Sequence, residues 1–191
     1  KRETLRRLIR SADDFKNAIV FCNRKREVAL LHRSLLRHKF NAVALHGDLD
    51  QSARTAALDA FRNGEAKLLI ASDVAARGLD IPAVSHIFNF DVPIHADDYI
   101  HRIGRTGRAG REGHAFMIAG PQDFKAVAAI EKLTGFKLVR EEMTDIEVTP
   151  DHRSRGERDR GGRDGRRGGR ERDRSRHRGD APYHDQVASM A

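Results

Sequence analysis

Short apolar runs alternate with amphipathic stretches along residues 1–145 of this chain. Continuous apolar runs are typical of buried strands, and they predict strands at residues 17–22, 42–45, 67–71, 84–90 and 114–119. Apolar residues at helical spacing predict helices at residues 4–12, 24–38, 51–62, 96–103 and 122–133. This alternation predicts an α/β fold, an open and mostly parallel sheet with helices on both faces.

The composition changes sharply near Pro150. Residues 151–180 consist of Arg, Asp, Glu, Gly, Ser and His alone, and residues 181–191 show no strong structural pattern. Such a segment buries too little apolar surface to offset its conformational entropy. We therefore predict a folded domain over residues 1–145 and a disordered tail over residues 146–191.

The overall charge narrows the class of partner. The formal net charge is +8, with 34% charged residues, which favours a polyanionic partner such as nucleic acid, although a protein that is merely basic fits as well. The single cysteine, Cys22, excludes an internal disulfide. No apolar run approaches the ~18 residues of a transmembrane helix, and no signal peptide opens the chain. We expect a cytoplasmic protein without a membrane partner, and Lys1 in place of Met indicates a fragment.

Polar loops follow three of the predicted strands. Residues 46–50 lead into Gln51 and Arg54, residues 72–82 combine Ser, Arg, Gly and Asp, and residues 89–93 lead into a later helix. The carboxyl ends of parallel strands share one edge of a sheet, where ligands collect. Each loop also has a plainer interpretation, with Gln51 and Arg54 as solvated helix residues and Asp80 as a cap.

The stretch from Tyr99 to Gly113 is rich in arginine and glycine. Glycine recurs at every third position from 104 to 113, with arginine at 102, 105, 108 and 111. Glycine allows backbone to approach a ligand closely, and the arginine fork matches phosphate oxygens. The stretch therefore predicts a site for concentrated negative charge.

Residues 101–108, with residues 74–81 upstream, resemble the second RecA-like domain of the DEAD-box RNA helicases. The family's motifs occur in order, as motif IV at residues 19–23, IVa at residues 46–54, V at residues 72–81 and VI at residues 99–108. The resemblance covers roughly residues 1–145, and His101 favours the DEAD-box branch. We interpret the chain as the C-terminal RecA-like domain of a bacterial member.

The resemblance implies a role for each matching residue. It implies arginine fingers on ATP at Arg105 and Arg108, ATP binding at Gly78 and Asp80, interdomain coupling at His101 and Arg102, and RNA binding at Gly47, Gln51, Arg54, Ser72 and Arg77. Residue 72 is Ser where the family usually has Thr, which keeps the hydroxyl. Residue 24 is Arg where relatives often have Thr, and no RNA role is assigned to it.

Two expected motifs are missing. The chain has no G-x-x-x-x-G-K-[ST] loop and no Asp-Glu-Ala-Asp sequence. The resemblance places both on a first RecA-like domain, which would hold magnesium and most of the ATP. The chain is then half of a composite site and should be inactive alone. The implied partners are RNA, that N-terminal domain of the same protein, and RNA-degradation or ribosome-assembly proteins.

An alternative is a non-enzymatic RNA-binding module or RNA chaperone that acts through the basic tail. The spacing of Gly104 and Gly107 satisfies the GxxG of KH domains, but a KH domain is smaller and lacks the strand–helix alternation. The tail also fits a solubilising or partner-docking segment.

Overall fold

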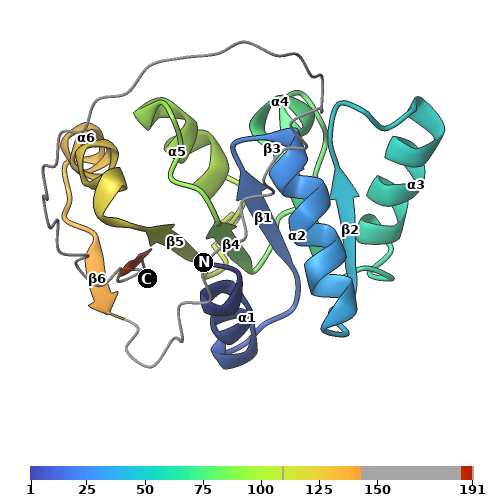
Figure 1. Ribbon diagram of the computed structural model, residues 1–191, viewed down its shortest axis with the longest axis horizontal. Helices are drawn as coiled ribbons and strands as arrows, with labels where there is room; N and C mark the ends of the chain where they lie inside the picture. Colours follow the sequence, from blue (N-terminus) through green and yellow to red (C-terminus); the bar gives the residue numbers. More distant parts are fainter. Residues whose placement is uncertain (109, 143–185, 191) are drawn as a thin grey trace, which may run out of the picture. The chain divides into compact units, whose positions relative to one another are not determined.

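The computed structural model describes residues 1–108, 110–142 and, as backbone, 186–190 (Figure 1). The helices are α1 (Arg2–Ser11), α2 (Lys25–Arg37), α3 (Gln51–Arg62), α4 (Asp73–Ala76), α5 (Ala96–Ile103) and α6 (Phe124–Thr134), with a 3₁₀ turn, η1, at Pro121–Asp123. The strands are β1 (Ala18–Cys22), β2 (Ala42–Leu45), β3 (Leu68–Ser72), β4 (His86–Asn89), β5 (His114–Ala119), β6 (Val139–Glu142) and β7 (Gln186–Met190).

The strands form one sheet in the order β2-β3-β1-β4-β5-β7-β6. The pairs from β2 to β5 are all parallel, whereas β7 runs antiparallel to both β5 and β6. The predicted open, mostly parallel α/β sheet is confirmed. Parallel pairing places the carboxyl ends of β1, β2, β3 and β4 along one edge, where the polar loops begin.

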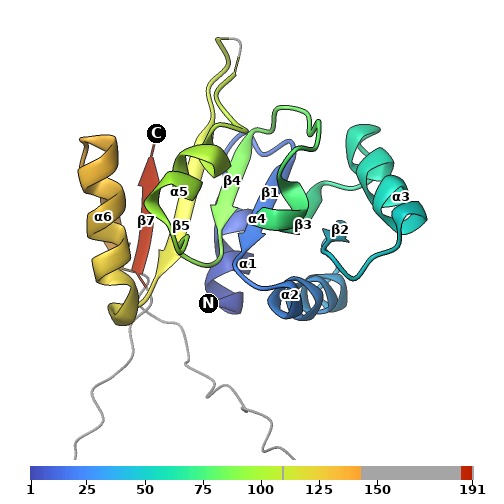
Figure 2. The same ribbon diagram turned by 90° about the horizontal axis from the view of Figure 1, so that it is seen from above.

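Alternate residues of β1 supply the two faces of the sheet. Val20 and Cys22 pack in a core cluster with apolar residues of α1 and α2. Ile19 and Phe21 pack in a second cluster with residues of α3 and α4. A third cluster joins α5 and α6 to β5. Helices therefore cover both faces, as predicted, and α1 and α2 lie together on one side (Figure 2).

Three short elements were not predicted. Helix α4 has only four residues, too few to show a helical period. Strand β6 reads Val-Arg-Glu-Glu and is exposed throughout, so it carries no apolar pattern. Strand β7 is far from β5 in sequence, and pairing across such a distance leaves no local signal. The predicted helix at residues 122–133 also begins with η1 and enters α6 at Phe124.

Strand β7 corrects one part of the predicted tail. Residues 186–190 were assigned to a disordered tail over residues 146–191, yet they form a strand that satisfies its backbone groups against β5 and β6. The other residues of that range lie outside the described part of the chain, so their predicted disorder and the boundary at residue 145 stay predictions. Within the described residues, no helix is long and apolar enough to cross a membrane.

Candidate functional site

Arg102 is the most buried charged side chain at the carboxyl edge of the sheet. It lies on α5, one helical turn after Tyr99, and its exposed fraction is 1%. All five of its N–H groups donate hydrogen bonds to acceptors within the chain. Nε and Nη2 bind Oδ1 and Oδ2 of Asp73 at 2.7 Å each, Nη1 binds Asn89 Oδ1 at 3.1 Å and the Asp91 carbonyl at 2.7 Å, and Nη2 binds Asn23 Oδ1 at 2.8 Å.

These contacts tie the ends of three strands together. Asn23 follows β1, Asp73 follows β3, and Asn89 and the Asp91 carbonyl lie at the end of β4. The guanidinium carbon also lies 5.2 Å from the centroid of the Phe21 ring, a cation–π contact. A buried charge is costly unless it is paired and hydrogen-bonded, and Arg102 is both. In this chain it orders the edge of the sheet.

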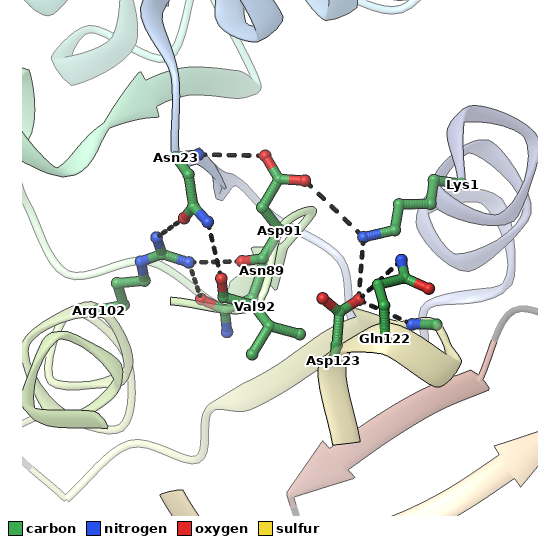
Figure 3. Close-up of polar contacts among 9 residues, drawn as sticks. Lys1, Asn23, Asn89, Asp91, Val92, Arg102, Gln122 and Asp123 are labelled. Carbon is green, nitrogen blue, oxygen red and sulfur yellow. Dashed lines mark hydrogen bonds and ion pairs between the residues drawn. The ribbon is translucent and has the colours of Figure 1, made fainter. Parts of the chain in front are cut away.

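Asn23 and Asp91 extend this network toward the start of the chain. The Asn23 amide N–H donates to Asp91 Oδ2 at 3.1 Å, and its Nδ2 donates to the Val92 carbonyl at 2.8 Å. Asp91 Oδ1 lies 3.8 Å from Lys1 Nζ, which lies 3.5 Å from Asp123 Oδ2. Figure 3 shows this continuous path from Arg102 to Lys1. The entry into α1 is therefore linked to the end of β4.

A cavity of about 230 Å³ opens beside this network. Its lining comprises Phe21, Asp73, Ala76, Arg77, Asp98, His101, Arg102 and Arg105. Asp73 pairs with Arg102, and Asp98 Oδ1 pairs with Arg77 Nη2 at 2.9 Å. Arg105 has no carboxylate partner among the described residues, and its Nη1 contacts only the Leu79 carbonyl at 3.5 Å. The lining thus carries one guanidinium more than it has carboxylates, which favours an anion.

The first residues of the glycine-spaced stretch after α5 form a turn that is hydrogen-bonded to Val84, just before β4. Thr106 Oγ1 donates to the Val84 carbonyl at 2.6 Å, and Arg108 Nε donates to the Gly104 carbonyl. Gly107 has φ +63°, which favours glycine, and a Cβ on Gly113 would lie 2.3 Å from the Gly107 amide nitrogen. The exposed Arg108 side chain and the half-buried Arg105 are held on this turn.

The loop between β2 and α3 forms a separate polar surface. Asp50 caps α3, because its Oδ1 accepts a hydrogen bond from the Ala53 backbone N–H at 2.7 Å. Gln51 is exposed in the first turn of the helix. Helix N-termini attract anions because their backbone N–H groups are free. Lys25 Nζ binds Asp48 Oδ1 at 2.7 Å and lowers the pKa of that carboxyl. The loop therefore offers a helix N-terminus with Arg54 half-buried in the same turn.

The structure brings only some of the predicted site residues together. The cavity gathers Arg77, His101, Arg102 and Arg105. Outside its lining lie Gly47, Gln51, Arg54, Ser72, Gly78, Asp80 and Arg108. Ser72 is only 7% exposed, Gly78 turns the chain with φ +73°, and the Asp80 carbonyl accepts from Arg62 Nη2 at 2.6 Å. The role assigned to each of these residues stays a prediction.

Sequence reasoning missed the acceptors of this site. Asp73 and Asp98 both line the cavity, yet no role was assigned to either from the sequence. Asn23 and Asp91 had been placed in motifs or loops without a role. The one available signal was the spacing of Tyr99 and Arg102, which share a helix face and are both buried. Among the described residues, no group of three or more His, Cys, Asp or Glu side chains lies together as a metal site.

Comparison with known proteins gives one consistent family. The family model described as the helicase conserved C-terminal domain matches residues 1–110. The ATP-dependent RNA helicase DBP8 of Scheffersomyces stipitis is 44% identical over 135 residues, which cover 70% of this chain and 30% of the relative. This chain therefore spans less than a third of the length of that relative.

Solved structures agree with the sequence comparison. The Escherichia coli DEAD-box protein SrmB, bound to regulator of ribonuclease activity A, superposes with a TM-score of 0.65 at 37% identity, covering 69% of this chain and 77% of that one. A variant of Saccharomyces cerevisiae Dbp5 bound to RNA and ADP BeF3 superposes with a TM-score of 0.64 at 36% identity, covering 70% of this chain and 36% of that one.

Proposed function

This chain belongs to the family of helicase conserved C-terminal domains, as the second RecA-like domain of the DEAD-box RNA helicases, and we propose that it supplies half of a composite ATP and RNA site for unwinding or remodelling RNA. The observation that carries this proposal is the cavity at the carboxyl edge of the sheet, where Arg105 lacks a carboxylate partner among the described residues.

Arg105 and Arg108 are the proposed arginine fingers. Such fingers stabilise the charge that spreads over the phosphoryl oxygens in the transition state, an effect of about 10³ to 10⁵ in rate. The fit is supported by the position of Arg105 in an anion-favouring cavity and by the hydrogen bond from Thr106, which lies between the two arginines, to the Val84 carbonyl. Gly78 and Asp80 are the proposed further contacts to the nucleotide. Magnesium would screen the phosphates, held mainly by carboxylates of the first domain.

RNA is proposed to run over the loops of the same sheet edge. Gln51 and Arg54 lie in the first turn of α3, at its N-terminus. The side chain of Arg77, at the cavity, is 69% exposed. Gly47 and Ser72 are proposed to complete the contacts, which would bind the sugar–phosphate backbone without reading its sequence. The similarity to a Dbp5 variant solved with RNA and ADP BeF3 supports this assignment.

His101 and Arg102 are proposed to couple the two RecA-like domains. His101 is exposed at the cavity and suits a direct contact. Arg102 is buried with every donor used, so its contribution would be to position α5. Domain closure would be favoured by ATP and RNA together.

Two kinds of protein are proposed as further partners of this chain. The N-terminal RecA-like domain of the same protein is the required one. SrmB is solved with a regulator of ribonuclease activity, which supports proteins of RNA degradation as further partners. A cytoplasmic location and a bacterial origin stay predictions. RNA binding by the tail stays one too, because residues 143–185 lie outside the described part of the chain.

The test joins this chain to a first RecA-like domain that carries a P-loop and a DEAD motif. ATP hydrolysis is measured with and without single-stranded RNA for the joined protein and for each half alone. We expect RNA-stimulated hydrolysis only in the joined protein. Equal hydrolysis by the first domain alone would refute the composite site.

A further inference from the structure

The exposed face of α2 carries a row of arginines outside the site described above. Arg26, Arg33 and Arg37 are all exposed, and with Leu30 they follow the spacing of one helix face. The opposite face holds Val28, Leu31 and Leu35, which are buried in the core. We call Arg26, Arg33 and Arg37 the α2 basic stripe.

The stripe lacks acidic partners among the described residues. On α1, Arg6 and Arg7 pair with Glu3, and on α3, Arg62 pairs with Asp59. No such partner accompanies Arg26, Arg33 or Arg37 in the described part of the chain. The single acidic residue of α2, Glu27, lies off the stripe.

Only Arg37, in the last turn of α2, favours the stability of the helix through its dipole. Arg33 and Arg37 lie four residues apart, and like charges at that spacing destabilise a helix. A row of permanent positive charge with no carboxylate beside it raises the local potential, which attracts a polyanion. The stripe is therefore better explained by a ligand than by folding.

The stripe begins beside the proposed RNA surface. Lys25, in the first turn of α2, binds Asp48 in the loop that precedes Gln51. From Arg26 to Arg37 the helix rises by about 16 Å along one face of the sheet (Figure 1). An RNA strand on the loop between β2 and α3 would therefore lie next to the first turn of α2, where the stripe begins.

We propose that the α2 basic stripe binds the sugar–phosphate backbone of single-stranded RNA as the strand leaves the loop between β2 and α3. This inference rests on the proposed RNA helicase function and adds a second contact surface to it. An acidic protein is the poorer fit, because protein interfaces centre on apolar and aromatic side chains. The stripe offers Leu30 and, beside it, the exposed Leu36, and α2 carries no Phe, Tyr or Trp.

The test compares two double variants of the full 191-residue chain. Arg33→Gln with Arg37→Gln removes two charges from the stripe, and Lys125→Gln with Lys132→Gln removes two exposed charges from α6. Binding is measured by fluorescence anisotropy over a series of salt concentrations. The probes are a short oligoribonucleotide and others roughly twice as long, extended at either end.

The stripe variant should bind a long RNA more weakly than the wild-type chain. Its plot of log affinity against log salt should also be less steep, by about 1.4 in slope, or about 0.7 for each lost phosphate contact. The short RNA and the α6 variant should keep the wild-type slope. Thermal unfolding confirms that both variants are folded.

Three results would overturn the proposal. If the stripe variant keeps the wild-type slope on the long RNAs, the stripe is refuted while the RNA function stands. If the stripe variant loses binding to polyglutamate but not to RNA, the face takes an acidic protein. If neither the wild-type chain nor the joined two-domain protein binds RNA at low salt, the proposed function fails and the stripe fails with it.

Discussion

Arg102 and Asp73 form a two-armed ion pair across the carboxyl edge of the sheet, with Nε–Oδ1 and Nη2–Oδ2 both at 2.7 Å. Arg102 is 1% exposed at its side chain and Asp73 is 23% exposed. The pair joins α5 to the end of β3. It therefore fixes the helix from which the turn with Arg105 and Arg108 emerges.

Asp73→Ala should strongly destabilise the domain. The change removes two of the five hydrogen bonds to Arg102 and leaves a buried guanidinium without its carboxylate, and breaking a buried pair in this way costs about 3 to 5 kcal/mol. Urea unfolding measures the loss of free energy. Asp98→Ala is the control, since its partner Arg77 is 69% exposed and the loss should stay below about 1 kcal/mol. Similar losses in both variants would contradict the role given to Arg102.

Gly113→Ala should disturb the turn that carries the proposed arginine fingers. The new Cβ would lie 2.3 Å from both the Gly107 amide nitrogen and Thr106 Oγ1, so backbone must shift. We expect the joined two-domain protein to lose at least about tenfold in RNA-stimulated ATPase, since small misplacements of catalytic groups are costly. Gly120→Ala meets only the Gln122 side chain and should keep its activity. An unchanged turnover for Gly113→Ala would contradict the dependence of turnover on the shape of this turn.

Acidification should destabilise the domain through His86. Burial lowers the pKa of His86 below its ordinary value of 6.5, and His114 lowers it further, while Asp14 opposes the shift. The ring packs against Phe15, Phe88, Phe116 and His114. Because the unfolded state binds the proton more readily, this stability is complete above about pH 6.5 and falls as the pH drops toward the folded pKa.

Urea unfolding between about pH 7.5 and about pH 5 measures how the free energy of unfolding depends on pH. This range spans the ordinary pKa of histidine. His86→Phe should flatten the profile, whereas the exposed His95→Gln should keep the wild-type slope. A wild-type slope in His86→Phe would assign the acid sensitivity to another group.

The pair of Arg77 and Asp98 should compete with RNA. Arg77 is proposed to bind the RNA backbone, yet Nη2 already lies 2.9 Å from Asp98 Oδ1. Asp98→Asn should tighten RNA binding by up to about fivefold, since an exposed pair is worth up to about 1 kcal/mol. Arg77→Gln should weaken binding, and anisotropy at fixed salt measures both. Weaker binding by Asp98→Asn would mean that the pair orients Arg77 for RNA instead.

The regular part of the fold could be predicted because its signals are local. Apolar runs such as residues 18–22 fill both faces of the sheet, and this pattern is visible in any window of the sequence. Helix α4 and strand β6 were missed because each has only four residues. A helix of that length shows no helical period, and the strand reads Val-Arg-Glu-Glu without an apolar pattern. Strand β7 was missed because its pairing with β5 depends on partners far away in the sequence.

The arginines of the site were predicted from the sequence, but the oxygen atoms that accept their hydrogen bonds were not. Arg102, Arg105 and Arg108 have similar sequence surroundings, and only burial separates the first from the other two. The partners of Arg102 come from residues 11 to 79 positions away, so no spacing rule connects them. The pairing of Asp98 with Arg77 could not be predicted for the same reason, because Arg77 lies on another element.

The most direct test of the whole account replaces Arg105 or Arg108 by Lys in the joined two-domain protein and measures RNA-stimulated ATP turnover. Lysine keeps the charge but loses the guanidinium fork, so turnover should fall by about 10³ or more in each variant. Arg111→Lys, in the same exposed turn, should keep the wild-type rate. Near-normal turnover in both Arg105→Lys and Arg108→Lys would contradict the assignment of these residues to ATP.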